Sequence, residues 1–150
     1  MSDKIGLKGC HRDNELMVEY DGKRVEYGMV LRKDETQKRP KVKLELEKGK
    51  MYSLIMVDPD APSPKDPVYR YYLHWLIVNI KKNEDGMIVN EYKGPAPPSS
   101  SGKHRYYISL FEQKEVINLS EMERPKFNLE KFIEKYESRL VGCTKYEVIG

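Results

Sequence analysis

The sequence predicts a single, mostly β domain over residues 1–150, and three observations carry that prediction. The length of 150 residues is typical of one domain. Apolar and polar residues alternate over short stretches, as they do in strands with one buried face. Turn-forming Gly, Pro and Asp residues separate these stretches, and apolar residues at helical spacing occur only late in the chain. Neither a repeat nor a low-complexity segment interrupts the pattern.

Short strands are predicted in order along the chain. Alternation resumes on both sides of Asp21-Gly22, a dipeptide typical of a tight hairpin turn. The runs 51–57 and 73–80 are almost continuously apolar, which predicts two central strands buried on both faces. The remaining strands are expected at 42–47, 88–92, 105–111 and 144–148.

One helix is expected near the C-terminus. Asn128 is a suitable N-cap, and Gly142 is a suitable terminator. The apolar stripe of this helix consists of Leu129, Phe132, Ile133 and Tyr136.

Charge and cysteine content restrict the class of protein. The 27 Lys and Arg residues and 24 Asp and Glu residues, a net charge of +3, are interspersed, so no basic stripe for nucleic acid is present. The N-terminus has no continuous apolar stretch, which predicts an unexported, cytoplasmic protein with peripheral membrane contact at most. The spacing of Cys10 and Cys143 matches neither a disulfide framework nor a zinc pattern, so we expect two reduced thiols.

Two proline-rich loops are the expected place for function. The loop 58–70 contains four prolines, and the loop 94–102 contains three prolines followed by three serines. Proline fixes its own φ and restricts the preceding residue, so both loops are stiff. Stiff polar loops at the ends of buried strands are typical of preorganised sites.

Polar residues beside these loops suggest an anion pocket. Asp58 and Asp60 follow one apolar strand, His74 lies inside another, and His104 and Tyr106 follow the second loop. Taken singly, His74 is more often a satisfied core histidine, and the two aspartates more often form an Asx turn. Taken together, these residues can form a site for phosphate. A nearby carboxylate raises the pKa of an imidazole, and the charged imidazole then attracts phosphate together with a tyrosine hydroxyl and free N–H groups.

Two other chemistries fit these residues less well. Two histidines and a carboxylate can hold a metal, but no His-x-His or Glu-x-x-His spacing occurs here. Ser99, Ser100 or Ser101 with a histidine base would suit a hydrolase, but no nucleophile elbow surrounds these serines. We therefore expect no enzyme activity, no metal and no other cofactor.

Several motifs resemble the phosphatidylethanolamine-binding protein family, which includes the Raf kinase inhibitor proteins and plant flowering-time regulators. The matching segments are Asp-Pro-Asp-Ala-Pro-Ser at 58–63, Asp66-Pro67 with Arg70, Tyr-Leu-His-Trp-Leu at 72–76, Gly-Pro-Ala-Pro-Pro at 94–98, and Gly102 with His104-Arg105-Tyr106. The resemblance implies a large central antiparallel sheet packed on a smaller one, with few helices. It also implies a pocket for phosphatidylethanolamine or another phosphate-bearing small ligand.

The resemblance assigns roles to residues of this pocket. Asp60, Pro62 and Arg70 are expected to be structural, with a cis Ala61–Pro62 bond. The expected function is non-catalytic binding, and the alternative is a protein-interaction module that inhibits a signalling protein such as a kinase or protease. The expected ligand-binding residues are Asp58, Tyr72, His74, Ala96, Pro98, Gly102, His104 and Tyr106.

This chain also departs from the family pattern. Ala96 stands where the family has glycine, and Ser100-Ser101 precede Gly102, so we expect a different loop path. The last predicted strand ends near Gly150 without the C-terminal helix of animal members, which predicts a more open site. If the histidines must be charged, affinity should fall as pH rises.

Overall fold

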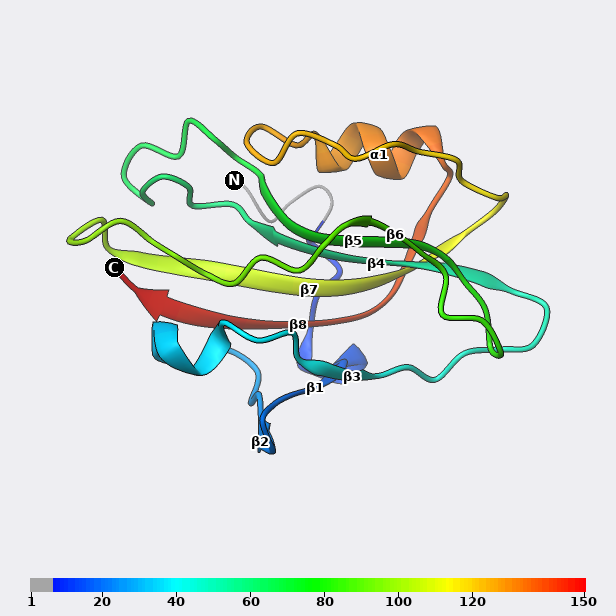
Figure 1. The fold of residues 1–150 in the computed structure, drawn as a ribbon, viewed down its shortest axis with the longest axis horizontal. Helices are drawn as coiled ribbons and strands as arrows, with labels where there is room; N and C mark the ends of the chain where they lie inside the picture. Colours follow the sequence, from blue (N-terminus) through cyan, green and yellow to red (C-terminus); the bar gives the residue numbers. More distant parts are fainter. Residues whose placement is uncertain (1–6) are drawn as a thin grey trace.

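The computed structural model describes residues 7–150, which form two antiparallel sheets (Figure 1). The large sheet has the strand order β6-β5-β4-β7-β8, and the small sheet has the order β2-β1-β3. The large-sheet strands are β4 (Met51–Asp58), β5 (Tyr72–Ile80), β6 (Met87–Asn90), β7 (Lys103–Gln113) and β8 (Arg139–Ile149). The small-sheet strands are β1 (Met17–Tyr20), β2 (Lys23–Arg24) and β3 (Lys41–Lys43).

Helices are few and short. The α-helix α1 (Leu129–Lys135) covers one face of the large sheet, and the small sheet lies on the other face (Figure 1). Of two 3₁₀ turns, η2 (Arg12–Asn14) precedes β1, and η3 (Lys33–Thr36) lies between β2 and β3 in sequence. Within the described residues, every helix is too short and too polar to cross a membrane. The predicted mostly β architecture with a helix near the C-terminus is confirmed.

An apolar cluster packs on each face of the large sheet. One contains Leu73 and Phe132 and lies under α1, and the other contains Val18 and Ile108 and lies under the small sheet. Successive residues of β4 and β5 point to opposite clusters because strand side chains alternate. This is why the runs 51–57 and 73–80 are apolar at almost every position.

Tyrosine hydroxyls join the two sheets inside the second cluster. The Tyr20 hydroxyl of β1 lies 2.7 Å from the Tyr146 hydroxyl of β8 and 2.8 Å from the Tyr92 hydroxyl. Tyr92 donates to the carbonyl of Thr36 at 2.6 Å. Burial raises the pKa of Tyr92 to about 12, so these hydroxyls keep their protons and act as a neutral link between the sheets.

Most predicted elements are present, with shifted ends. Asp21 and Gly22 both adopt positive φ, as the predicted hairpin turn requires. Asn128 caps α1 by accepting from the Lys131 amide. The prediction that Gly142 ends this helix is wrong, because positive φ at Glu137 turns the chain earlier and Gly142 lies in β8 beside a bulge. The last strand consequently begins at Arg139 and not at residue 144.

The prediction of two reduced thiols is also wrong. Cys10 and Cys143 form a disulfide, with their Cα atoms 5.4 Å apart. The N-terminal segment runs beside β8, where the Leu16 amide donates to the carbonyl of Cys143. This contact between the two ends of the chain brings the sulfur atoms together, and cysteine spacing carries no sign of it.

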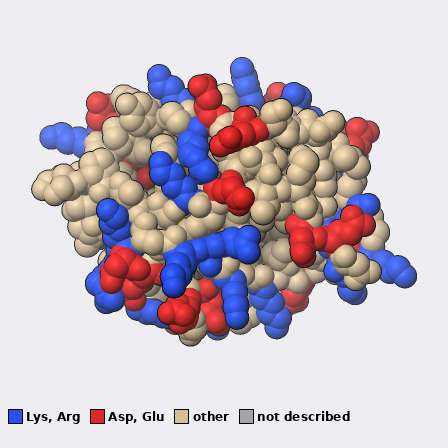
Figure 2. Space-filling model, in the orientation of Figure 1, with Lys and Arg blue, Asp and Glu red and all other residues tan. Residues whose placement is uncertain are grey.

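Surface charge is mixed, as the sequence predicts. On the face shown in Figure 2, basic and acidic side chains lie among one another over both the sheet and the loops.

Candidate ligand-binding pocket

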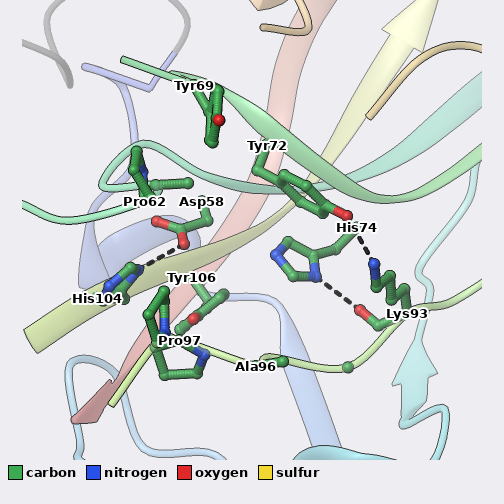
Figure 3. A pocket seen from close by; sticks show the side chains of 13 residues that line it. Asp58, Pro62, Tyr69, Tyr72, His74, Lys93, Ala96, Pro97, His104 and Tyr106 are labelled. Atoms are coloured by element: carbon green, nitrogen blue, oxygen red, sulfur yellow. Dashed lines mark hydrogen bonds and ion pairs between the residues drawn. The ribbon is translucent and has the colours of Figure 1, made fainter. Parts of the chain in front are cut away.

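A pocket of about 210 Å³ opens at one end of β4, β5 and β7 (Figure 3). Antiparallel pairing sets Asp58, the last residue of β4, opposite Tyr72, the first residue of β5. His74 lies two residues further along β5 and therefore on the same face as Tyr72. The first residues of β7 reach the same end, because Val57 of β4 pairs with Tyr107.

Seven of the eight predicted ligand-binding residues line this pocket, and so does Pro62. Gly102 does not: it adopts a φ of +107° and lies near Pro64. The seven are Asp58, Tyr72, His74, Ala96, Pro98, His104 and Tyr106.

Asp58 is a buried carboxylate that accepts hydrogen bonds on both oxygens. One oxygen accepts from the Asp60 amide at 2.7 Å, which is the expected Asx turn, and the other accepts from His104 Nδ1 at 2.8 Å. Burial raises the pKa of Asp58, and its hydrogen bond from His104 opposes that rise. Asp58 therefore forms the expected Asx turn and also holds His104 at the pocket.

His104 uses both ring nitrogens within the protein. Nδ1 donates to Asp58, and the Ser101 hydroxyl lies 2.9 Å from Nε2. The imidazole is 1% exposed. Neither ring nitrogen of His104 is therefore free for a ligand. Ser100, the residue before Ser101 in the second loop, adopts a positive φ of +63° although it is not glycine.

His74 is held as a neutral imidazole. Its Nδ1 lies 2.7 Å from the carbonyl oxygen of Lys93, and because a carbonyl only accepts, Nδ1 carries the hydrogen. The other nitrogen faces the pocket as an acceptor (Figure 3). Burial lowers the pKa of His74 to about 4. The interpretation that a carboxylate raises the pKa of an imidazole is therefore wrong for His74, whose partner is a carbonyl oxygen.

Lys93 is the functional candidate that sequence reasoning missed. Its Nζ donates to the Tyr72 hydroxyl at 2.7 Å and lies 5.3 Å from the centroid of that ring. Among the described residues, it is the only Lys or Arg that lines the pocket. One lysine among 27 basic residues gives no signal by itself. Ala61, Tyr69 and Gly94 complete the lining together with Pro97, and none of these four is among the predicted ligand-binding residues.

Asp60 and Arg70 lie behind the pocket wall. Asp60 accepts from the backbone and side-chain nitrogens of Arg105 at 2.9 Å. Arg70 donates to the carbonyl of Pro59 at 2.5 Å and approaches Asp60 at 3.8 Å. The Ala61–Pro62 bond is cis, as expected. These contacts connect the first loop to β7, which is the structural role expected for Asp60 and Arg70.

The described side chains offer no obvious metal site. Over residues 7–150, no group of three or more His, Cys, Asp and Glu side chains is placed to hold a metal ion.

Comparison with known proteins places this chain in a family. The family model described as phosphatidylethanolamine-binding protein matches residues 18–146. The chain belongs to the phosphatidylethanolamine-binding protein family. The rice (Oryza sativa subsp. japonica) protein MOTHER of FT and TFL1 homolog 2 is 38% identical over 120 residues, covering 75% of this chain and 68% of the rice protein. The putative odorant-binding protein A5 of Drosophila melanogaster is 32% identical over 133 residues, covering 81% of this chain and 63% of the fly protein.

Several solved structures share this architecture. A carboxypeptidase Y inhibitor, solved in complex with its cognate proteinase, superimposes with a TM-score of 0.82 at 22% identity, over 97% of this chain and 88% of the inhibitor. The solution structure named CG7054 superimposes with a TM-score of 0.75 at 31% identity, over 92% of this chain and 86% of that one. The phosphatidylethanolamine-binding protein of Plasmodium vivax superimposes with a TM-score of 0.74 at 23% identity, over 89% of this chain and 83% of the Plasmodium chain.

Proposed function

We propose that this protein binds a small phosphate-bearing ligand, as a lipid headgroup or a free phosphate ester, without catalysing a reaction. The supporting observation is the convergence of Asp58, His74, His104 and Tyr106 on one pocket. Its volume of about 210 Å³ is below the roughly 300–1,000 Å³ of pockets that hold drug-sized ligands, which suits a small headgroup. An open, hydrated pocket implies weak binding, and a Kd of about 1 mM corresponds to about −4 kcal/mol.

A titration with phosphoethanolamine tests this function. We expect the side-chain NMR signals of His74 and His104 to shift in a saturable manner. The exposed His11 lies outside the pocket, so its signals provide an internal control and should not move. Unchanged signals of His74 and His104 at high ligand concentration would exclude the proposed site.

A second candidate function is inhibition of another protein. The likeness to the carboxypeptidase Y inhibitor supports a shared fold at 22% identity, and the two structures share the two-sheet framework. If this chain inhibits an enzyme, a panel of purified carboxypeptidases and kinases should contain one that loses activity at equimolar inhibitor. Headgroup binding alone predicts no such loss.

The side chains Ser101, His104 and Asp58 form a hydrogen-bonded chain with separations of 2.9 and 2.8 Å. Such distances are typical of Ser-His-Asp triads. However, Ser101 does not line the pocket, so its hydroxyl would not meet a ligand bound there, and we assign it to orienting His104. A fluorophosphonate probe should leave Ser101 unlabelled; labelling of this serine would contradict a non-catalytic role.

The disulfide bears on where the protein works. The sequence predicts a cytoplasmic location together with two reduced thiols. Disulfides form and persist in oxidising compartments, so the Cys10–Cys143 bond favours such a compartment over the cytoplasm. Thiol labelling of the protein taken from its native source distinguishes the two locations.

A further inference from the structure

The two sheets leave a groove between their open edges. Of the described strands, β3 ends the small sheet and β6 ends the large sheet, so each has one edge without a strand partner. Both strands line a groove of about 780 Å³, to which β3 contributes Val42 and β6 contributes Ile88. An open edge beside a groove offers backbone N–H and C=O groups to a further strand.

The segment 41–47 has the side-chain pattern of a longer strand than the one that is paired. Val42, Leu44 and Leu46 are half-buried and pack against the second apolar cluster, and the residues that alternate with them are exposed. This period of two is that of a strand. The pairing with β1 nevertheless ends at Lys43. Residues 44–46 therefore alternate like a strand but have no strand partner among the described residues.

The floor of the groove is apolar. It consists of Leu54, Trp75, Ile77 and Ile80, and Ile88 on the β6 wall is 42% exposed. The buried indole N–H of Trp75 has no hydrogen-bond partner within residues 7–150. A strand laid in the groove would point every second side chain at this floor. Apolar side chains at those positions would remove the floor and Ile88 from water, which stabilises a complex.

The β3 wall carries unpaired positive charge. Arg39 and Lys41 line the groove, and Lys43 is the next exposed residue of β3. None of these three side chains forms an ion pair with another described residue, and Asp85 is the one acidic residue of the lining. Opposite charges stabilise cross-strand pairs, and edge lysines oppose pairing with other strands. The charge of this edge therefore favours an acidic partner.

We propose that the open edge of β3 binds an extended peptide segment in which apolar and acidic residues alternate. The segment adds a fourth strand to the small sheet beside residues 41–46. Its apolar side chains point toward Ile77 and Ile88, and its carboxylates lie beside Lys41 and Lys43. Backbone hydrogen bonds supply affinity, and alternation and charge supply selectivity. No described residue lines both this groove and the pocket at the ends of β4, β5 and β7, so the inference does not depend on the proposed function.

Two synthetic peptides test the alternation. The probe is an octapeptide with blocked ends in which valine and glutamate alternate, and the control contains four valines followed by four glutamates. Because Trp75 is the single tryptophan of the chain and lies in the groove floor, its fluorescence measures binding there. We expect a saturable change with the probe and at least tenfold weaker binding of the control. About 1 M salt should weaken the probe by screening its charges, and phosphoethanolamine should not compete with it.

Charge reversal tests the partner's acidity. The double variant Lys41→Glu, Lys43→Glu should bind the valine–glutamate peptide at least tenfold more weakly and should gain binding of the corresponding valine–lysine peptide. This gain also shows that the variant is folded. The double variant Lys65→Glu, Lys131→Glu makes the same change in net charge at exposed residues outside the groove, and it should keep the preference of the wild type.

Amide hydrogen exchange locates the bound peptide. Amides of residues 44–46 should become protected when the valine–glutamate peptide binds. Equal binding of the two valine–glutamate peptides, or an unchanged preference after reversal of Lys41 and Lys43, would overturn the proposal. Protection of the same amides in the protein alone, together with a dimer in analytical ultracentrifugation, would show that a second copy occupies the edge and would also overturn it.

Discussion

The two ends of the same three strands both bury polar side chains, and they use them differently. At the pocket end, Asp58, His74 and His104 include charged or titratable groups, and the free nitrogen of His74 faces a cavity. At the opposite end, Gln113 and Asn79 are neutral and fully engaged. The side-chain carbonyl of Gln113 accepts from the Ser53 hydroxyl and from the backbone N–H of Asn79. The NH₂ group of Gln113 donates to the side-chain oxygen of Asn79 and to the backbone carbonyl of Glu115.

The difference shows how a ligand site can be told from a structural network. Burial of polar groups alone does not mark a site, because the Gln113 network is buried and its hydrogen-bonding capacity is used. A donor or acceptor that has no partner and faces a cavity does mark a ligand site. At the pocket end, this capacity belongs to His74 and to the groups around Lys93 at the mouth.

The largest expected effect is at the structural end. Gln113→Leu leaves the Ser53 hydroxyl and the Asn79 amide without their acceptor, and each buried unsatisfied group costs about 1–3 kcal/mol. We expect a loss of about 4 kcal/mol in the free energy of unfolding, measured with urea. Ser53→Ala removes only one of these bonds and should cost about 1 kcal/mol. If Gln113→Leu also abolished phosphoethanolamine shifts at His74, the two ends would not be separable.

The next effect concerns pH and the pocket end. The folded pKa of His74, about 4, lies below the unfolded value of about 6.5, so the unfolded state binds the proton more readily. Stability from the neutral imidazole is complete above about pH 6.5 and is lost as pH falls toward 4, amounting to about 3 kcal/mol. His74→Gln should remove this part of the pH dependence, and His11→Gln should retain it. Parallel stability curves for the wild type and His74→Gln would contradict the buried, neutral assignment.

A smaller effect is expected behind the pocket wall. Asp60→Asn removes the negative charge that Arg105 and Arg70 share, and because both guanidinium groups are partly exposed, we expect a loss of about 2 kcal/mol. Thermal unfolding would measure it. The exposed pair of Arg32 and Asp34 is a matched control, and Asp34→Asn should leave the melting temperature unchanged.

The smallest effect is expected for the serine beside His104. Ser101→Ala removes one hydrogen bond, worth about 1 kcal/mol, and should alter the His104 resonances. Because Ser101 lies outside the lining, the affinity for phosphoethanolamine should stay within twofold of the wild type. A large loss of affinity would place this serine in the site after all.

Local pattern predicted the strands and the cap of α1, because their periodicity and capping residues are fixed by backbone geometry. It failed at Gly142, since glycine is equally suited to ending a helix and to a bulge in β8. It overestimated the strand at 42–47, which the structure limits to β3, because alternation shows a buried face but not a pairing partner.

The convergence of Asp58, His74 and His104 was implied by the resemblance and not by the residues singly. What sequence reasoning could not supply were the partners of each imidazole. Whether a histidine lies next to Asp58 or next to the carbonyl of Lys93 depends on strand register and loop path. For the same reason, neither the role of Lys93 nor the pairing of Cys10 with Cys143 could be foreseen.

The bond between Cys10 and Cys143 closes a covalent ring over 133 positions of sequence, which includes the whole pocket. A protease that cuts once in either proline-rich loop would therefore produce two fragments that remain attached. Such nicked protein would migrate as one species on a non-reducing gel and separate only after reduction.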